Sequence, residues 1–371
     1  MNTPEMRRQC ADRLSNGSSK AAQMSAFVGL DGFVDEILHV VDKRQSADKY
    51  ERLTTIAKFS QRLAGAAGQS TNVELVTQLT KLGGNGPIMA NALATFGMKV
   101  AYLGILGYPS LHPVFNEFAK RAEVFSIAEP GYTDALEFAD GKIMLGKHSS
   151  LRQMNWQNIN ERFGREKFAG YFGSSDLIGF VNWTMLTAMS DIWRFVLREI
   201  CPQMKGPRRK LFVDLADPEK RTAADISDAL GLISEFQKYF DVILGLNEKE
   251  GHEIAENLGV KSTGSQPEHL LQLCRDVHAR LKIDTLVIHP TAYALASGPD
   301  GCAIVEGPFV ATPKITTGAG DHFNSGFCLG KLLGLSTQDC VLTGVTTSGF
   351  YVRTGESPKI SDLVALLNAW P

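Results

Sequence analysis

The sequence predicts an α/β fold in which a mostly parallel sheet is covered by helices on both faces. Short apolar runs typical of buried strands alternate with segments whose apolar residues recur every three or four positions, as in helices. Parallel strands buried on both faces read as continuous apolar runs, because neither face meets water. The expected core strands lie at residues 26–29, 100–104, 177–181, 211–214, 242–245 and 285–289.

Two helices between these strands are indicated by the spacing of their apolar residues. The pattern from Leu53 to Leu63 predicts a helix over about residues 49–66, and the pattern from Ile192 to Ile200 predicts another. Stripes of this kind are typical of helix faces that pack on a core. We therefore expect neither helix to form a binding surface.

A second group of strands departs from the parallel pattern. An Asp-Gly pair at residues 140–141 separates two apolar-rich runs, which is a strong signal for a β-hairpin over residues 135–145. Together with the runs at residues 33–41 and 72–82, this hairpin is expected to form a small β-lid. The alternative is an ordinary peripheral hairpin.

Composition indicates one large intracellular domain over residues 1–371. The chain carries 38 Lys and Arg against 40 Asp and Glu, a formal net charge of −2, so neither nucleic acid nor an anionic membrane is expected as a partner. The six cysteines are widely spaced, without a C-x-x-C pair, and are expected to be reduced thiols. The first 22 residues lack the apolar run of a signal peptide, and no stretch is long enough to cross a membrane. The expected location is cytoplasmic.

A turn of small residues stands directly before an acid that opens an expected helix, at Thr316, Gly318, Ala319, Gly320 and Asp321. The backbone N–H groups of such a turn can approach a phosphate closely, and the positive end of the helix adds to the attraction. The helix dipole should also keep Asp321 ionised at neutral pH, so that it can accept a proton from a substrate hydroxyl. An anion hole with a base beside it is what phosphoryl transfer requires. The alternative is a turn that is glycine-rich for packing alone.

Two acids follow the first expected strand, Asp31 and Asp35. Ligands of open α/β sheets bind beyond the carboxyl ends of the strands, where carboxylates can accept hydrogen bonds from the hydroxyl groups of a ligand. Asp35 is the first choice for this role and Asp31 the second. The alternative for Asp31 is that it satisfies the donors of a turn next to Gly32.

Asn247 and Glu250 follow another apolar run and would share one face of a helix beginning at Glu248. One carboxylate and one amide oxygen could position a hydrated Mg²⁺ ion, directly or through its waters. The alternative is a capping box, in which Asn247 caps the helix and Glu250 reaches back to the cap.

Four segments resemble, in order and spacing, the PfkB-type (ribokinase-like) carbohydrate kinases, over nearly the whole chain. Residues 83–90, with Gly97 and Gly107, are similar to the first signature of the family, and residues 316–327 to the second. Residues 247–250 match its N-x-x-E motif, and residues 214–218 match a strand end in the middle of the family's chain. This chain departs from the pattern at Ile88, where an asparagine is usual, and at Ile315, where a polar or acidic residue is usual.

The resemblance implies a ribokinase-like fold, ATP as the phosphoryl donor with magnesium, and a lid that covers the sugar and can pair with a second subunit. It assigns the grip on the sugar to Asp35, Gly84 and Asn85. Several relatives are activated by K⁺ near the anion hole, whereas Ile315 offers no side-chain oxygen, so weak potassium dependence is expected.

The sequence therefore predicts a sugar kinase that transfers the γ-phosphoryl group of ATP to a hydroxyl of a small polyhydroxy substrate. One alternative is a nucleoside kinase of the same fold, whose acceptor pocket would be lined by aromatic residues such as Phe33 and Trp183. Another is a sugar-binding regulator without activity, against which Asp321 and the metal site argue. We expect His289 to be a packed or capping residue and His322 to point outward from its helix.

Overall fold

The computed structural model describes residues 2–261, 264 and 266–370, and within them the largest sheet has nine strands. Its strands all run in the same direction except β13, which pairs in antiparallel fashion with both β12 and β14. The spatial order is β14 (Gly301–Glu306), β13 (Tyr293–Gly298), β12 (Thr285–Ile288), β11 (Phe240–Leu246), β10 (Arg209–Asp214), β9 (Leu177–Phe180), β1 (Ser25–Gly29), β5 (Lys99–Gly104), β6 (Glu123–Ser126). All six strands expected from apolar runs are present.

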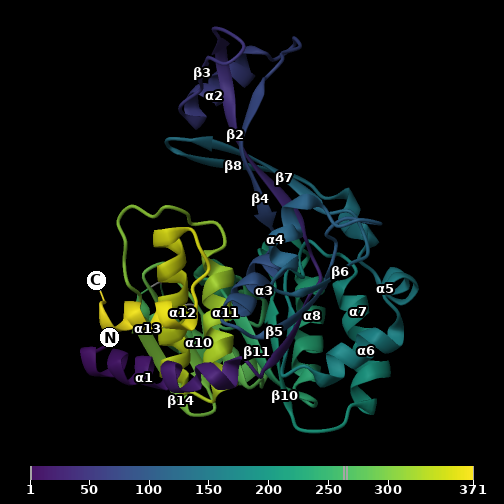
Figure 1. Cartoon of the computed structure of the whole chain (residues 1–371), viewed down its shortest axis with the longest axis vertical. Helices are drawn as coiled ribbons and strands as arrows, with labels where there is room; N and C mark the ends of the chain where they lie inside the picture. Colours follow the sequence, from purple (N-terminus) through teal and green to yellow (C-terminus); the bar gives the residue numbers. More distant parts are fainter. Residues whose placement is uncertain (1, 262–263, 265, 371) are drawn as a thin grey trace.

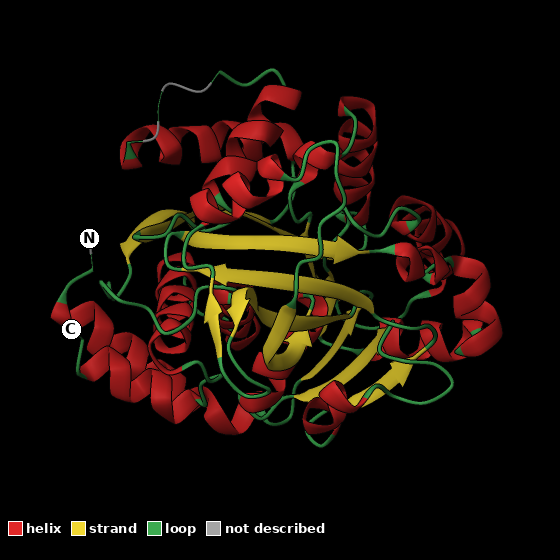
Figure 2. Cartoon of the chain, turned by 90° about the horizontal axis from the view of Figure 1, so that it is seen from above, coloured by secondary structure: helices red, strands yellow, loops and turns green. Residues whose placement is uncertain are grey.

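Helices cover both faces of this sheet (Figure 2). Successive strand residues alternate between two cores: Phe27 and Ile178 contribute to one, whereas Val28 and Leu177 contribute to the other. The first core is completed by α5 (Trp156–Arg162), α6 (Arg165–Ser174), α7 (Met189–Phe195), α8 (Ala223–Phe236), α9 (Glu248–Asn257) and α10 (Pro267–Leu281). The second is completed by α1 (Pro4–Ala21), α3 (Asn85–Thr95), α4 (Asn116–Ala119), α11 (Ala319–Leu333), α12 (Thr337–Thr354) and α13 (Ile360–Asn368).

The connections between these elements contain short helical segments. A π-helical segment at Val196–Ile200 continues α7, so the helix expected around Ile192 to Ile200 is present. Single 3₁₀ turns lie at Pro113–Phe115, Ser149–Gln153, Cys201–Gln203 and Pro218–Lys220.

A second sheet projects from one end of the body, with helix α2 at its tip (Figure 1). Its strand β2 pairs with β4 and β3 in antiparallel fashion and with β7 in parallel, while β7 and β8 form a hairpin. The elements are β2 (Phe33–Arg44), β3 (Tyr50–Arg52), α2 (Ile56–Gly65), β4 (Leu75–Gly83), β7 (Gly131–Phe138) and β8 (Gly141–Lys147).

The helix expected over residues 49–66 is shorter than predicted. Residues 50–52 form β3, and α2 begins only at Ile56, because the Thr55 side chain caps it by accepting the Lys58 N–H. The hairpin of β13 and β14 was not predicted, although an Asp-Gly pair at its turn, residues 300–301, is the same signal that marks the hairpin at residues 140–141.

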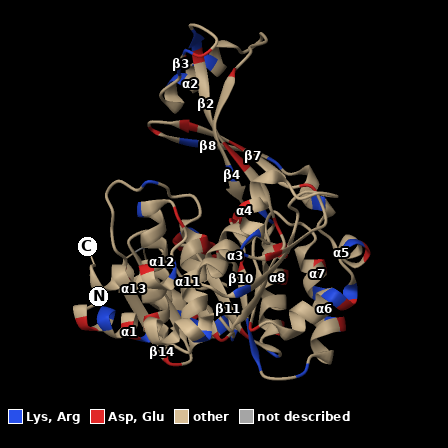
Figure 3. Cartoon of the chain, in the orientation of Figure 1, with Lys and Arg blue, Asp and Glu red and all other residues tan. Residues whose placement is uncertain are grey.

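Acidic and basic residues are interspersed along the ribbon of the chain (Figure 3). No helix in the described residues is both long enough and apolar enough to span a bilayer.

Candidate active site

Two cavities meet at the loop that leads into α11. The first, about 450 Å³, is lined by Thr316, Ala319 and Gly320 of this loop together with His289 and Asn247, which follow β12 and β11. We call it the donor cavity. The second, about 360 Å³, is lined by the remaining loop residues, Thr317, Gly318 and Asp321, and by residues of the second sheet. We call it the acceptor cavity.

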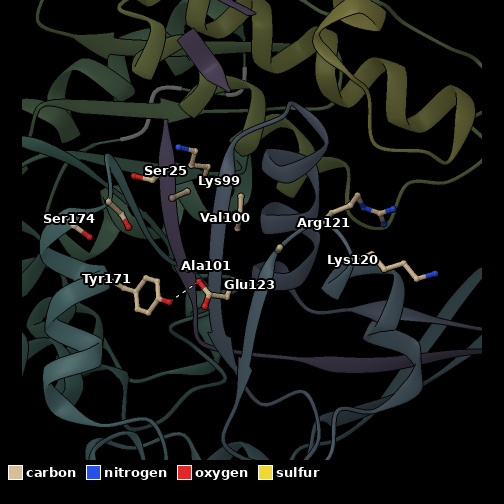
Figure 4. Close-up of a pocket in the computed structure, with 12 residues that line it drawn as sticks. Ser25, Lys99, Val100, Ala101, Lys120, Arg121, Glu123, Tyr171 and Ser174 are labelled. Atoms are coloured by element: carbon tan, nitrogen blue, oxygen red, sulfur yellow. Dashed lines mark hydrogen bonds between the residues drawn. The ribbon is translucent and has the colours of Figure 1, made fainter. Parts of the chain in front are cut away.

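Both cavities lie beyond the carboxyl ends of parallel strands, as expected for ligand sites of this architecture. Another cavity, of about 560 Å³, lies at the opposite end of the sheet (Figure 4). Ser25, Lys99 and Glu123, the first residues of β1, β5 and β6, line it. Because that cavity is at the amino ends of the strands, far from the glycine-rich loop, it is not the candidate active site.

The loop presents free backbone donors at the start of α11. Gly318 adopts a positive φ of 94° and serves as the N-cap, and the helix begins at Ala319. The Ala319 N–H is directed back into the loop, where it donates to the Thr316 carbonyl at 3.1 Å. Within the described chain, no hydrogen bond is found from the N–H groups of Gly318, Gly320 and Asp321. The geometry therefore offers these three N–H groups as the anion hole, with Asp321 in place of the expected Ala319.

Asp321 stands in the first turn of α11 and is 7% exposed. Its Oδ1 accepts a hydrogen bond from Asn85 Nδ2 at 3.0 Å, so the glycine-rich turns of the two signatures meet at this carboxyl. Burial raises the pKa of Asp321 to about 8, and the Asn85 hydrogen bond only partly opposes this. The expectation that the helix dipole keeps Asp321 ionised at neutral pH is wrong for the free protein, because loss of hydration outweighs the dipole. An acid with a raised pKa is the stronger base once ionised.

Asp31 holds the start of α3 in place. Its carboxylate accepts the backbone N–H groups of Asn85 and Gly86 at 3.0 and 2.9 Å, and it also accepts from Asn182 Nδ2 at 2.8 Å. It is fully buried, does not line the acceptor cavity, and has its pKa raised to about 6 by burial. Gly86 permits this contact, because a Cβ there would lie 2.5 Å from Asp31 Oδ1. The geometry thus favours the reading in which Asp31 satisfies turn donors, although the turn is that of α3.

Asp35, in contrast, lines the acceptor cavity from strand β2. A Cβ at Gly83 would lie 2.5 Å from both carboxylate oxygens of Asp35, so the glycine allows the carboxylate to reach across from the paired strand. Burial raises the pKa of Asp35, whereas Lys81, its cross-strand partner, lowers it. Gly84 and Asn85 line the same cavity, so three of the four predicted acceptor residues lie together.

Several cavity-lining residues were not anticipated from the sequence. Thr133 and His148 come from the second sheet and its end, and Asn182 follows β9. The position of Asn182 at the carboxyl end of a predicted strand is a signal that could have identified it. Trp183, in contrast, is fully buried, donates from Nε1 to Ser190 Oγ at 2.9 Å and does not line the cavity. Phe33 does line it.

Asn247 and Glu250 form the capping box that was the alternative to a metal site. Asn247 Oδ1 accepts the Glu250 N–H at 2.9 Å, and the Glu250 carboxylate accepts the N–H groups of Asn247 and Asp217, both at 2.8 Å. Glu250 is buried, and burial raises its pKa. A carboxylate has further lone pairs, so capping does not exclude a water-mediated contact with an ion.

Two further oxygen-bearing residues lie near this box. Asp214, at the end of β10, is buried, and its pKa is raised by burial and by the charges of Glu250 and Asp321. Asn324 donates to Asp214 at 2.8 Å, while its own Oδ1 is buried and has no hydrogen-bond partner among the described residues. Mutually repelling carboxyls and an unpaired amide oxygen fit a hydrated Mg²⁺ ion. Because no group of three acidic, His or Cys side chains in the described chain is placed to hold a metal directly, contact through water and bound phosphates fits best.

Of the two histidines near the loop, His322 is buried and His289 is half-buried, and both are neutral. His289 lines the donor cavity and packs on Phe323, with ring centroids 4.8 Å apart, and burial lowers its pKa to about 4. This agrees with the packed role expected for it. His322 is 2% exposed and bonds inward, so the expectation that it points outward is wrong. The helix face that carries it is covered by α12, which sequence spacing did not reveal.

Comparison with known proteins agrees with this geometry. Residues 2–370 match the model of the prokaryotic ketohexokinase family. A ketohexokinase of Haloferax volcanii is 30% identical over 344 residues, which cover 92% of this chain and 90% of the relative.

Solved structures share the fold at low sequence identity. A ribokinase of Arabidopsis thaliana in complex with ribose and ATP has a TM-score of 0.64 at 14% identity, covering 93% of this chain and 98% of that one. A variant of Escherichia coli phosphofructokinase-2 has a TM-score of 0.61 at 14% identity, covering 93% and 99%. The expected ribokinase-like fold and the expected ATP-dependent carbohydrate kinase are both confirmed. The chain belongs to the prokaryotic ketohexokinase family.

Proposed function

We propose that this chain transfers the γ-phosphoryl group of ATP to a hydroxyl group of a ketohexose. The observation that supports this most directly is the loop of residues 316–321, which lines the donor cavity with one set of residues and the acceptor cavity with the other. A phosphoryl group held at the free N–H groups of this loop would face Asp321 across a short gap. The ketohexose is suggested by the family match and by the relative from Haloferax volcanii.

Asp35, Gly84 and Asn85 are the proposed contacts to the sugar. A carboxylate that accepts hydroxyl hydrogen bonds in a closed cavity contributes affinity and orientation together. Burial raises the pKa of Asp35, and Lys81, which lies opposite it on the paired strand, acts against this rise and so favours the ionised form needed for this role. Asn85 also donates to Asp321, so it can connect sugar placement to the position of the base.

The donor cavity is proposed to hold the nucleotide. Its lining is largely apolar, and Phe309, which is 70% exposed, stands on the loop that borders it. Arg353 fixes the backbone there by donating to the Phe309 carbonyl at 2.6 Å. An exposed aromatic ring beside an apolar cavity is suited to stack on a nucleobase.

The proposed reaction uses Asp321 as the proton acceptor and the N–H groups of the loop as donors to the phosphoryl group. The sugar hydroxyl loses its proton to the Asp321 carboxylate as its oxygen bonds to the γ-phosphorus, and the bond to the bridging oxygen of ADP breaks. The N–H groups of Gly318, Gly320 and Asp321 stabilise the negative charge on the moving group. Magnesium, positioned through water by Glu250 and by Asp214 with Asn324, would supply the counter-charge that the ATP phosphates need and would favour the ionised form of Asp321.

The test is a screen for ADP release over ketohexoses, aldohexoses, pentoses and nucleosides, with Asp321→Asn as the control. We expect turnover with a ketohexose and a loss of about a hundred- to ten-thousandfold in kcat in the variant. Highest turnover with a nucleoside would replace the proposal by a nucleoside kinase, a reading that the buried position of Trp183 disfavours. Sugar binding by calorimetry without turnover in the wild type would favour a regulator.

We also propose that the chain is one domain whose second sheet acts as a lid and pairs with a second copy of the chain. Ile37, Leu79, Ala135 and Met144 form one row across four strands of this sheet by direct register. Leu79 and Met144 are 54% and 47% exposed, although Met144 also lines the acceptor cavity. A second lid would cover this apolar row.

Light scattering should then give twice the monomer mass, and Leu79→Asp should give the monomer with a raised sugar KM. A monomeric wild type would contradict the pairing. The proposed compartment is the cytoplasm, which is supported by six free cysteines, five of them buried. Fractionation of cells that produce the protein tests this.

A further inference from the structure

We infer that Tyr351 and His322 are positioning residues that fix the backbone of the loop whose N–H groups form the anion hole. This inference rests on the proposed kinase function. Neither residue lines the acceptor or the donor cavity, so neither is placed to touch sugar or nucleotide. Their side chains instead make hydrogen bonds to backbone carbonyl groups of the loop.

Tyr351 makes the contact that fixes the first peptide. It lies on α12, is 7% exposed, and donates from its hydroxyl to the Thr317 carbonyl at 2.9 Å. This is the one hydrogen bond to that carbonyl found in the described part of the chain. In a trans peptide the C=O and the following N–H point in opposite directions within one plane. Holding the Thr317 carbonyl toward α12 therefore turns the Gly318 N–H away from α12, as a free donor.

His322 holds the next peptide, whose N–H group, that of Ala319, donates to the Thr316 carbonyl, so His322 fixes the fold of the loop rather than a free donor. Its Nδ1 lies 2.7 Å from the Gly318 carbonyl, and its backbone N–H donates to the same oxygen at 3.1 Å. The imidazole also stacks on the Tyr351 ring, with centroids 3.7 Å apart and an angle of 12° between the planes. The two rings thus form a rigid pair that holds consecutive carbonyls of the loop.

The hydrogen-bond partners of His322 determine its tautomer. A carbonyl oxygen can only accept, so Nδ1 carries the proton, and in a neutral ring Nε2 must accept. Nε2 lies 2.9 Å from Ser357 Oγ, which is the donor to it. Burial lowers the pKa of His322 to about 4, so the ring stays neutral at physiological pH. Ser357 Oγ in turn accepts from Asn91 Nδ2 at 3.1 Å, which anchors the pair to α3.

Packing closes the space around the same peptide. A Cβ at Gly318 would lie 3.2 Å from the Tyr351 hydroxyl and 3.3 Å from Ile88 Cδ1, so both side chains pack closely on the loop at this residue. Ile88 stands where an asparagine is usual in the family signature, and its side chain packs near the Tyr351 hydroxyl at this residue. The direction of the free donors is therefore fixed before substrate arrives, as electrostatic stabilisation of a transition state requires.

The test is Tyr351→Phe, which removes one hydroxyl and keeps the stacked ring. Tyr171→Phe is the matched control, because Tyr171 also donates one hydroxyl hydrogen bond, to Glu123 Oε2 at 2.7 Å, at the opposite end of the sheet (Figure 4). We expect Tyr351→Phe to lower kcat about ten- to a hundredfold, less than the loss of a donor itself, with sugar KM within twofold. Tyr171→Phe should keep wild-type kinetics.

A binding measurement separates positioning from general loosening of the fold. Calorimetry with ADP, magnesium and aluminium fluoride in the presence of the sugar probes a mimic of the moving phosphoryl group, and ADP alone serves as the reference. In Tyr351→Phe, affinity for the mimic should fall by about the same factor as kcat, while ADP affinity stays within twofold. Ser357→Ala, which leaves Nε2 of His322 without its donor, should shift both quantities in the same direction by a smaller factor, and it serves in place of Tyr351→Phe should that variant not fold.

Turnover of Tyr351→Phe within twofold of wild type would overturn the inference and leave the proposed function standing. So would equal losses of affinity for ADP and for the mimic, since they would indicate a disturbed nucleotide cavity. A wild-type protein without turnover on any sugar would remove the proposed function, and this inference with it.

Discussion

Replacing Asp321 by asparagine should make the protein less active and more stable, and the gain in stability should depend on pH. Asp321 is buried, and its pKa is raised from 3.8 to about 8. An unfolded chain ionises this carboxyl above about pH 4, whereas the folded chain keeps it protonated up to about pH 8. The raised pKa therefore means that wild-type stability falls as pH rises through this window. An asparagine at this position would carry no such penalty, while its amide oxygen could still accept from Asn85.

The size of the effect follows from linkage. Each unit of pKa difference corresponds to about 1.4 kcal/mol, so keeping Asp321 protonated at pH 7 costs roughly 4 kcal/mol of folding free energy relative to a group with its ordinary pKa. Below about pH 4 both states of the wild type are protonated and the cost vanishes. The difference in unfolding free energy, variant minus wild type, should rise by about 1.4 kcal/mol per pH unit between pH 5 and 7.

Urea unfolding at pH 5, 6, 7 and 8 without ligands measures this difference, and contributions from titrating groups that do not interact with Asp321 cancel in it. Asp191→Asn on α7, where the carboxylate is 78% exposed, is the control and should give a flat difference. Turnover of the Asp321 variant should fall by about a hundred- to ten-thousandfold over the same range. A flat difference for Asp321→Asn, or a variant that is less stable than wild type at pH 8, would refute the burial of a protonated carboxyl at this position.

Three further predictions concern the two cavities and the cation requirement. Asp35→Ala should lower kcat/KM for the sugar by on the order of 2 to 4 kcal/mol in transition-state energy and leave KM for ATP unchanged, and steady-state kinetics with normal sugar parameters would remove Asp35 from the site. Phe309→Ala should raise KM for ATP about tenfold without changing KM for the sugar, because stacking on a base contributes roughly 1 to 3 kcal/mol. Replacing tetramethylammonium by potassium at equal ionic strength should raise turnover less than about twofold. Lys314 Nζ already donates to the Thr354 carbonyl beside the loop, at 2.7 Å, and the side chain of Ile315 offers no oxygen ligand to a cation. A large rise in turnover would contradict this prediction.

The core sheet could be predicted from the sequence because its information is local. Strands buried on both faces read as continuous apolar runs, and each run from residues 26–29 to 285–289 lies in the expected strand. The glycine-rich turn before Asp321 could also be predicted, because the small residues and the start of the helix that together form such a turn lie in one contiguous stretch of sequence. At Thr55, the capping side chain sets the start of α2 at Ile56, later than the apolar spacing predicted, so the error there concerned only the length of the helix.

The roles of the individual acids could not be predicted, because they depend on contacts between distant segments. Asp31 and Asp35 are four residues apart, and both follow β1. Asn85, Gly86 and Asn182 converge on Asp31 and leave it no part in the acceptor cavity, whereas Asp35 on β2 remains open to that cavity. The prediction that the helix dipole keeps Asp321 ionised was wrong for a related reason. The dipole belongs to its own helix, but the burial that opposes it comes from the rest of the fold.

The departure from the family signature at Ile88 is explained by the contacts of the loop. Ile88 does not leave a gap where an asparagine is usual, because it packs against Gly318. The hydroxyl of Tyr351 and the ring of His322 hold the neighbouring carbonyls of Thr317 and Gly318. The orientation of the anion hole therefore depends on side chains of α3, α11 and α12, three helices that pack together in one core. We therefore expect turnover to be sensitive to substitutions in that core, even where they change no residue that lines either cavity.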